Sequence, residues 1–228
     1  MQAFANQPFL EKRRKLARWC NYIGLGALFG GLFLASRSPA ISSGLLLVGV
    51  FAASMGAFMA NRYVREPRPD QLLSRALDGL DKRYTLLSYY LPTEHVLFSH
   101  DGFTAIIARS QQGTIRCAQG RWTHKQRGRW FKQLMGEPSL ANPMQDLARE
   151  RQDLQRWATS QQLGDVPING LVVFTGKDVV LELKDPSVPA VTLSHLADYV
   201  REGSTAAPLT TSQRREIENK LHALVGNH

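Results

Sequence analysis

The chain combines a long uncharged region near its start with a mixed polar sequence beyond it. Two apolar runs without a charge, Trp19–Ser36 and Ala40–Asn61, contain 18 and 22 residues and are separated by Arg37-Ser38-Pro39. At about 1.5 Å per residue, such runs can cross a hydrocarbon core about 30 Å thick. The pattern therefore predicts a transmembrane helical hairpin over 19–36 and 40–61. One alternative is that the first run is a secretory signal peptide, but the length of this run and the presence of the second run disfavour it. The other alternative is a buried helical pair.

Positive charges flank the two runs unevenly and predict their orientation. Arg37 is the only charge between the runs, whereas eight basic residues lie outside them: Lys12, Arg13, Arg14, Lys15, Arg18, Arg62, Arg65 and Arg68. Basic residues collect on the cytoplasmic side of membrane proteins. We therefore expect a multi-pass protein of a bacterial-type inner membrane with both termini in the cytoplasm.

The runs have the composition of an anchor. Neither contains an ionisable side chain of the kind that a transporter or proton channel uses. Small residues recur at a four-residue step, namely Gly26 and Gly30 in the first run and Gly49, Ala53 and Ala57 in the second. This step lets helices approach closely. It permits packing of the two runs against each other and self-association of the chain.

Composition limits the remaining possibilities. The chain has 228 residues, 28 basic and 19 acidic, with a net charge of +9 and 43% hydrophobic residues. The hydrophobic content excludes a disordered chain. Two cysteines, Cys20 and Cys117, are too few for a disulfide framework, and no Cys/His spacing indicates zinc. The excess of positive charge points to an anionic partner, either nucleic acid or lipid.

The polar part predicts an α/β domain. We expect a basic cytoplasmic segment over 1–18, a Pro-rich linker over 62–69, the domain over 70–205 and a C-terminal helix over 206–228. Apolar spacing predicts helices over 70–83, from Asn142-Pro143 onward, over 194–202 and over 212–225, the last capped by Ser212. Alternating or β-branched runs predict strands over 84–91, 94–99, 103–108, 168–175 and 179–183. The stretch 109–141 is expected to be irregular.

Four segments in order resemble the nuclease-related domain, NERD. They are LLSRALDGL, SYYLPTEHVLFSHDGFTAIIARSQQGTI, ANPMQDLARERQDLQRW and VPINGLVVFT, and the resemblance covers about 66–185. The family pattern is an acidic helix, a strand pair carrying Asp-His and then Glu-x-Lys, a helix opened by Asn-Pro-x-Gln, and a hydrophobic strand ending in Phe. The resemblance implies a restriction-endonuclease-like mixed sheet flanked by helices.

The resemblance also implies site residues. Asp70 falls where the family has its helix-borne Glu, Glu94 where it has Asp, and Gln145 at its glutamine; His95 and Gly102 match its histidine and turn glycine. If the domain were active, Asp70, Glu94, Arg109 and Gln145 would be catalytic, and Asp70 and Glu94 would hold Mg²⁺ or Mn²⁺.

The central Glu-x-Lys pair is missing. Those two positions hold Ile107 and Arg109. Isoleucine removes a metal ligand, and arginine stays protonated and cannot act as a base. We therefore expect no ordinary NERD nuclease activity and no required cofactor. A second Glu-x-Lys, Glu182-Leu183-Lys184, reads as a half-exposed edge strand, although a relocated site would use Glu182 and Lys184.

A basic stretch interleaved with aromatic residues follows the predicted strand pair. From Gly102 to Gly136 it holds seven basic residues and no acidic one. The nucleic-acid-binding candidates in it are Arg116, Arg121, Lys125, Arg127, Arg129, Trp130 and Lys132. Basic and aromatic side chains together suit DNA or RNA. Anionic lipid and a solvated loop are the alternatives, and Trp122 is expected to pack inside.

Three functions follow from this sequence. The first is a degenerate nuclease fold that binds nucleic acid at the membrane. The second is an active metal-dependent nuclease with a rearranged site. The third is a membrane-bound scaffold for protein partners.

Overall fold

The computed structural model describes residues 1–125, 140, 142–186, 188–203 and 208–226. The described residues separate into two compact units. Met1–Asn6, Pro69–Arg127 and Leu140–His228 contain the α/β unit, and Gln7–Arg68 forms the helical unit. The helical unit is therefore inserted in the α/β unit, six residues after the first residue given.

A mixed six-stranded sheet in the order β1-β2-β3-β4-β7-β9 is the centre of the α/β unit. Its strands are β1 (Gln2–Ala5), β2 (Thr85–Ser88), β3 (His95–Ser99), β4 (Gly102–Arg109), β7 (Ile168–Phe174) and β9 (Ala190–Thr192). β3 is antiparallel to both β2 and β4, whereas β1 is parallel to β2, and β4, β7 and β9 are mutually parallel. The α/β class and mixed sheet that the sequence predicts are confirmed.

Helices cover both faces of this sheet. α3 (Pro69–Ala76) and α6 (Leu196–Glu202), which follows the 3-10 turn η2 (Leu193–His195), bury their apolar residues in one core. α5 (Pro143–Ser160) and α7 (Thr211–Gly226) bury theirs in the other. Asn142 caps α5 by accepting a hydrogen bond from the Met144 N–H (3.2 Å), as predicted. The alternating side chains of β4 and β7 supply both cores.

A second sheet includes two strands from the stretch 109–141, so the prediction that this stretch is irregular was wrong for β5 and β6. β5 (Gly113–Ala118) lies between β6 (Arg121–Lys125), to which it is antiparallel, and β8 (Val179–Lys184), to which it is parallel. Ile115 and Cys117 are buried while Arg116 between them is exposed. Buried and exposed side chains thus alternate along β5 with period two, but the strand has too few apolar residues for this alternation to be recognised in the sequence.

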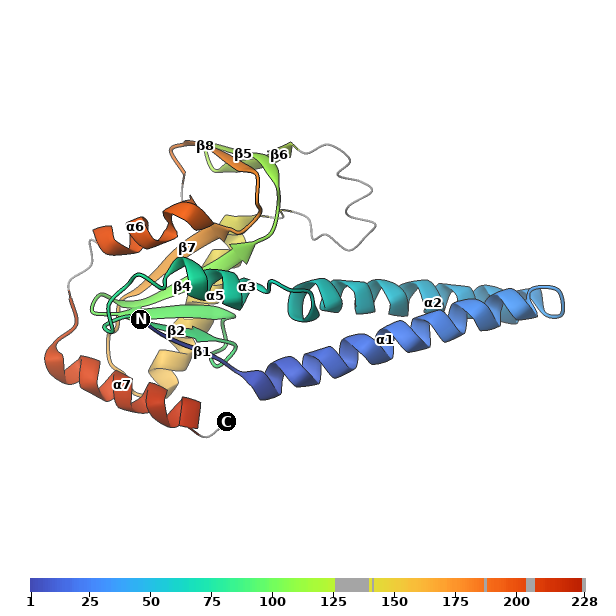
Figure 1. The fold of residues 1–228 in the computed structure, drawn as a ribbon, viewed down its shortest axis with the longest axis horizontal. Helices are drawn as coiled ribbons and strands as arrows, with labels where there is room; N and C mark the ends of the chain where they lie inside the picture. The colour runs from blue at the N-terminus through green and yellow to red at the C-terminus, as the bar shows by residue number, and fades with distance from the viewer. Residues whose placement is uncertain (126–139, 141, 187, 204–207, 227–228) are drawn as a thin grey trace. The chain divides into compact units, whose positions relative to one another are not determined.

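The helical unit consists of two antiparallel helices (Figure 1). α1 (Gln7–Leu34) and α2 (Pro39–Met59) are followed by the π-helical turn η1 (Ala60–Val64). Buried positions recur at a step of seven: Leu10, Ala17, Gly24 and Gly31 in α1, and Ser42, Gly49 and Gly56 in α2. A β-carbon placed on Gly24 would lie 2.7 Å from the Ala53 nitrogen, so the backbones are in close contact.

The predicted small-residue step was partly wrong. Gly49 and Ala53 do lie in the contact, but a β-carbon on Gly26 meets nothing within 4 Å, and one on Gly30 meets only Leu45, at 3.9 Å. The contact uses Gly24 and Gly31 instead because a seven-residue repeat, and not a four-residue one, keeps the same face toward an antiparallel partner.

Length and composition distinguish the two long helices. Among the described residues, one helical stretch, Pro39–Ala76, is long and apolar enough to cross a membrane, with an 18-residue window of mean hydropathy 1.9. α1 ends at Leu34 and not at Ser36. Its uncharged part, Trp19–Leu34, therefore rises only about 24 Å at 1.5 Å per residue.

Both ends of the chain belong to the α/β unit, contrary to the predicted boundaries. The expected basic segment 1–18 contains β1, which pairs with β2, and then enters α1 at Gln7 (Figure 1). The C-terminal helix packs into the core through Ile217 and Leu221. Its cap is Thr210 and not Ser212: the Thr210 Oγ1 accepts from the Gln213 N–H (3.3 Å), and the Gln213 Oε1 accepts from the Thr210 N–H (3.1 Å). This reciprocal pair is a capping box.

Candidate functional site

The two positions of the missing Glu-x-Lys pair lie at the end of β4. Ile107 is 8% exposed and packs in the core on the α5 side, beside Val172 of β7. Arg109, two residues on, emerges on the same face of the sheet. Its Nη2 donates to the Asp146 Oδ2 of α5, and its side chain is 13% exposed. The Asp146 side chain is 32% exposed, so the guanidinium is held in a partly buried ion pair.

Helix α5 presents Asp146 to this ion pair, whereas Gln145 is exposed. Leu147 and Leu154 are buried in the core beneath α5 and fix the rotation of the helix. Neighbouring helical residues differ by about 100° in direction, so the two side chains cannot both face β4. Sequence reasoning missed Asp146. The available signal was that Asp146 is an acidic residue in the first turn of this helix.

The two predicted acidic ligands lie on other elements. Asp70 is buried in the first turn of α3, on the sheet face opposite to α5. Glu94 is partly buried just before β3, where its carbonyl accepts from the Tyr89 N–H (2.8 Å). Within the described residues, no three His, Cys, Asp or Glu side chains form a group that could hold a metal ion. The arrangement offers a buried carboxylate on one face and an ion pair on the other.

His95 is a structural residue of β3. It is fully buried, its Nδ1 lies 3.0 Å from the Ser88 Oγ, and its ring meets Tyr89 edge-on with centroids 5.1 Å apart. These contacts tie β3 to β2 and the turn between them. Gly102, the matched turn glycine, has a φ of +100°, and a β-carbon there would lie 2.3 Å from the Pro167 carbonyl oxygen. Only glycine fits this position.

Glu182, the acid of the second Glu-x-Lys, is also engaged. Its carboxylate accepts from the Arg116 Nε (2.5 Å) and Nη2 (3.3 Å) across the parallel pair β5–β8. Lys184 is exposed two residues further, and β8 alternates between partly buried and exposed side chains along its length. This is the half-exposed edge strand that the alternating sequence predicts.

The outward side of the second sheet is basic. We call it the basic face; its charged side chains are Arg116, Arg121, Lys125, Glu182 and Lys184. In the register, Ala118 lies between Arg121 and Lys184, so these cations are two strands, about 10 Å, apart. Four cations against one carboxylate give the face a net charge of +3. No aromatic ring lies on this side of the described strands.

Trp122 points inward, as predicted. It packs against the core, with its ring 6.3 Å from that of Phe174 at the end of β7. Of the nucleic-acid-binding candidates, Arg127, Arg129, Trp130 and Lys132 lie outside the described residues. The described part of this stretch therefore offers cations for phosphate groups and keeps its indole for packing.

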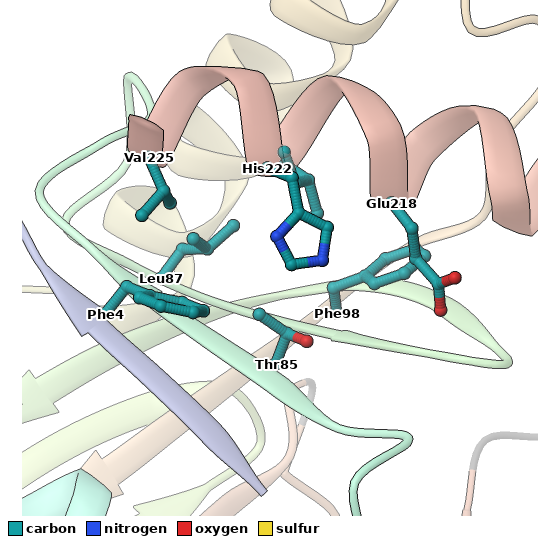
Figure 2. Close-up of a pocket in the computed structure, with 8 residues that line it drawn as sticks. Phe4, Thr85, Leu87, Phe98, Glu218, His222 and Val225 are labelled. Atoms are coloured by element: carbon teal, nitrogen blue, oxygen red, sulfur yellow. The ribbon is translucent and has the colours of Figure 1, made fainter. Parts of the chain in front are cut away.

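A small pocket that sequence reasoning missed lies between α7 and the edge of the main sheet. Figure 2 shows Phe4, Leu87 and Phe98 beneath it, with Glu218 and His222 of α7 above. The Glu218 Oε1 accepts from the Arg214 Nε (2.8 Å). The i,i+4 spacing of Glu218 and His222 on the last helix was the available signal. A single polar pair over an apolar floor gives no metal or nucleophile chemistry.

A comparison of the chain with protein-family models, with curated proteins and with solved structures finds no match.

Proposed function

We propose that this protein is a membrane-anchored, NERD-like domain protein whose nuclease fold lacks its catalytic pair and binds nucleic acid at the cytoplasmic face of the membrane. The main support for a loss of catalysis is the pair of residues at the end of β4. Ile107 is part of the hydrophobic core, and the Arg109 guanidinium is neutralised by Asp146. In the family pattern these two positions hold a glutamate, whose carboxylate would bind a metal ion, and a lysine.

The order of elements supports a restriction-endonuclease-like fold. A helix with an acidic residue in its first turn (α3), a meander of three strands (β2, β3 and β4), a helix opened by Asn-Pro (α5) and an apolar strand ending in Phe174 (β7) occur in this order, with β5 and β6 between β4 and α5. The family pattern has the same order of helix, strand pair, helix and strand, with β3 and β4 as the strand pair. The parallel pairing of β4 with β7 puts the last strand beside the one that would carry the catalytic pair.

The basic face supports nucleic acid as the ligand. Its exposed cations lie on a three-stranded sheet, and Ile115, Cys117 and Trp122 pack on the inward side of that sheet. Cations without stacking rings contact phosphates and not bases. Binding should therefore be insensitive to sequence and strongly dependent on salt.

The pairing of β1 with β2 supports two membrane crossings. β1 precedes the helical unit and β2 follows it, yet the two strands are adjacent in one sheet. A chain that leaves this sheet after β1 and rejoins it at β2 needs an even number of crossings, which favours a two-helix hairpin over a single crossing by α2. Two crossings, with Arg37 on the far side, fit the exposed apolar side chains of both helices, such as Phe33 (76% exposed) and Leu47 (74%). The distribution of positive charge around the two helices supports a cytoplasmic position for the α/β unit.

The test uses the full chain in nanodiscs with labelled single- and double-stranded DNA and RNA, in Mg²⁺, Mn²⁺ or EDTA. Salt-dependent binding without cleavage is expected. The test variant changes three cations of the basic face to glutamine, namely Arg121, Lys125 and Lys184. It should bind more weakly, and the slope of log binding constant against log salt concentration should fall in magnitude by about two, because each phosphate contact contributes about 0.7–0.9. A control variant with the same charge change replaces three exposed arginines on helices: Arg75, Arg149 and Arg215.

Two outcomes would replace this proposal. Metal-dependent cleavage that is lost in Glu94→Ala would favour the rearranged nuclease. Equal binding by the basic-face variant and its control would remove the basic face from the interface and favour a protein scaffold.

A further inference from the structure

An exposed ion pair lies in the middle of the basic face. Arg116 of β5 and Glu182 of β8 are direct neighbours in the parallel register, and the Glu182 carboxylate oxygens lie 2.5 Å from the Arg116 Nε and 3.3 Å from its Nη2. The two side chains are 59% and 46% exposed. Glu182 is the one acidic side chain of this face among the described residues. Arg116 thus has a carboxylate as its partner in the protein without nucleic acid.

The three other cations of the basic face surround Arg116. Each lies one strand across from Arg116 in the register and two residues further along or back; they are Arg121, Lys125 and Lys184. With strands about 4.8 Å apart and a rise of about 3.3 Å per residue, their α-carbons are each about 8 Å from that of Arg116. Nucleic acid that contacts these three cations therefore also meets the Arg116–Glu182 pair.

Glu182 works against that contact, because its carboxylate repels phosphate and already occupies the Nε and Nη2 side of the guanidinium. The pair is nevertheless easy to separate. An ion pair between exposed side chains favours the paired state by at most about fivefold. A phosphate presents oxygens that a guanidinium binds with the same two-pronged geometry as a carboxylate. Arg116 can therefore exchange Glu182 for a phosphate at little cost.

We infer that Arg116 exchanges partners when nucleic acid binds: Glu182 holds the guanidinium in the free protein, and a backbone phosphate takes it in the complex. This inference rests on the binding of nucleic acid by the basic face proposed above. It makes Arg116 a further phosphate contact of that face, and it makes Glu182 the residue that limits the affinity.

A double-mutant cycle measures the exchange. The full chain is placed in phosphatidylcholine nanodiscs, whose lipid has no net charge, and its affinity for a labelled DNA duplex is measured at about 0.1 M salt, where the Debye length is about 10 Å. The unaltered chain is compared with Glu182→Gln, Arg116→Gln and the double variant. The matched control is a second cycle on another exposed ion pair, that of Asp153 and Arg156 on α5, with Asp153→Asn and Arg156→Gln.

Glu182→Gln should bind DNA several-fold more tightly, because phosphate no longer meets a negative charge and Arg116 no longer has to leave a partner. Arg116→Gln should weaken binding in both backgrounds. The weakening should be about two- to fivefold larger in the Glu182→Gln background, since only in the unaltered chain does Arg116 give up Glu182 on binding. The control cycle should show no such difference.

The failures are distinguishable. No DNA binding by the unaltered chain, or the same binding after the three surrounding cations are changed to glutamine, would overturn the proposed function itself. If that binding is intact but Arg116→Gln weakens it by the same factor in both backgrounds, Arg116 does not leave Glu182 and the exchange alone is overturned. An equal gain in Glu182→Gln and Asp153→Asn would reduce the effect to net charge and also overturn the exchange.

Discussion

Replacing Gly24 of α1 by alanine tests the close approach of the two long helices. The new β-carbon would lie 2.7 Å from the Ala53 nitrogen and 3.0 Å from its Cα, both of them backbone atoms that cannot rotate away. An ordinary contact begins near 3.4 Å, so the helices must separate locally by 0.7 Å, the difference between 3.4 and 2.7. Such overpacking costs about 1–3 kcal/mol.

Gly26→Ala is the matched control. It lies one half-turn away on the same helix, and its β-carbon would meet nothing within 4 Å. Both substitutions gain the same helix propensity, up to about 1 kcal/mol, so the difference between the two variants isolates the steric cost. Gly26→Ala should therefore be the more stable by about 1–3 kcal/mol.

The assay is the loss of helical circular dichroism when the full chain in detergent micelles is titrated with SDS. Gly24→Ala should unfold at lower SDS than the unaltered protein or at about the same point, and Gly26→Ala at the same point or higher. If the two variants unfold together, the helices do not approach each other through Gly24, and the seven-residue contact is refuted.

Two further predictions concern the α/β unit. In urea unfolding, Gly102→Ala should destabilise the protein by at least about 2 kcal/mol more than Gly164→Ala. Both glycines have a positive φ (+100° and +72°), but of the two only Gly102 also has a backbone oxygen 2.3 Å from the new β-carbon. Burial, with a smaller contribution from Glu202, raises the pKa of Tyr199. Since the unfolded chain ionises this tyrosine first, stability should fall as the pH rises above about 10, and Tyr199→Phe should reduce that fall; an identical pH profile in the variant would contradict it.

The parts of the fold that local signals specify were predictable. The turn at Gly102 between two apolar runs predicted the β3–β4 pair, and Asn142-Pro143 predicted the start of α5. β1 was not, because four residues ahead of a basic helix carry little pattern, and their partner β2 comes more than 80 residues later. Long-range pairing of this kind is decided by tertiary packing and not by local propensity.

The candidate site shows the same division. The two-residue period of a strand predicted that Ile107 and Arg109 lie on one face of the sheet, and the structure confirms this. The choice between Gln145 and Asp146 depended on the rotation of α5, which the buried Leu147 sets. A shift of one residue on a helix changes direction by about 100°, so a motif match alone could not decide which side chain reaches Arg109.

The position of β1 also has a consequence for the order of synthesis. The ribosome makes β1 first and reaches β2 only after both long helices, so at about 5–20 residues per second the edge strand waits at least about 4 s for its partner. The main sheet can close only when α1 and α2 have already left the ribosome. Completion of the main sheet must therefore follow synthesis of both long helices, and a fragment that begins after the helices would lack its edge strand β1.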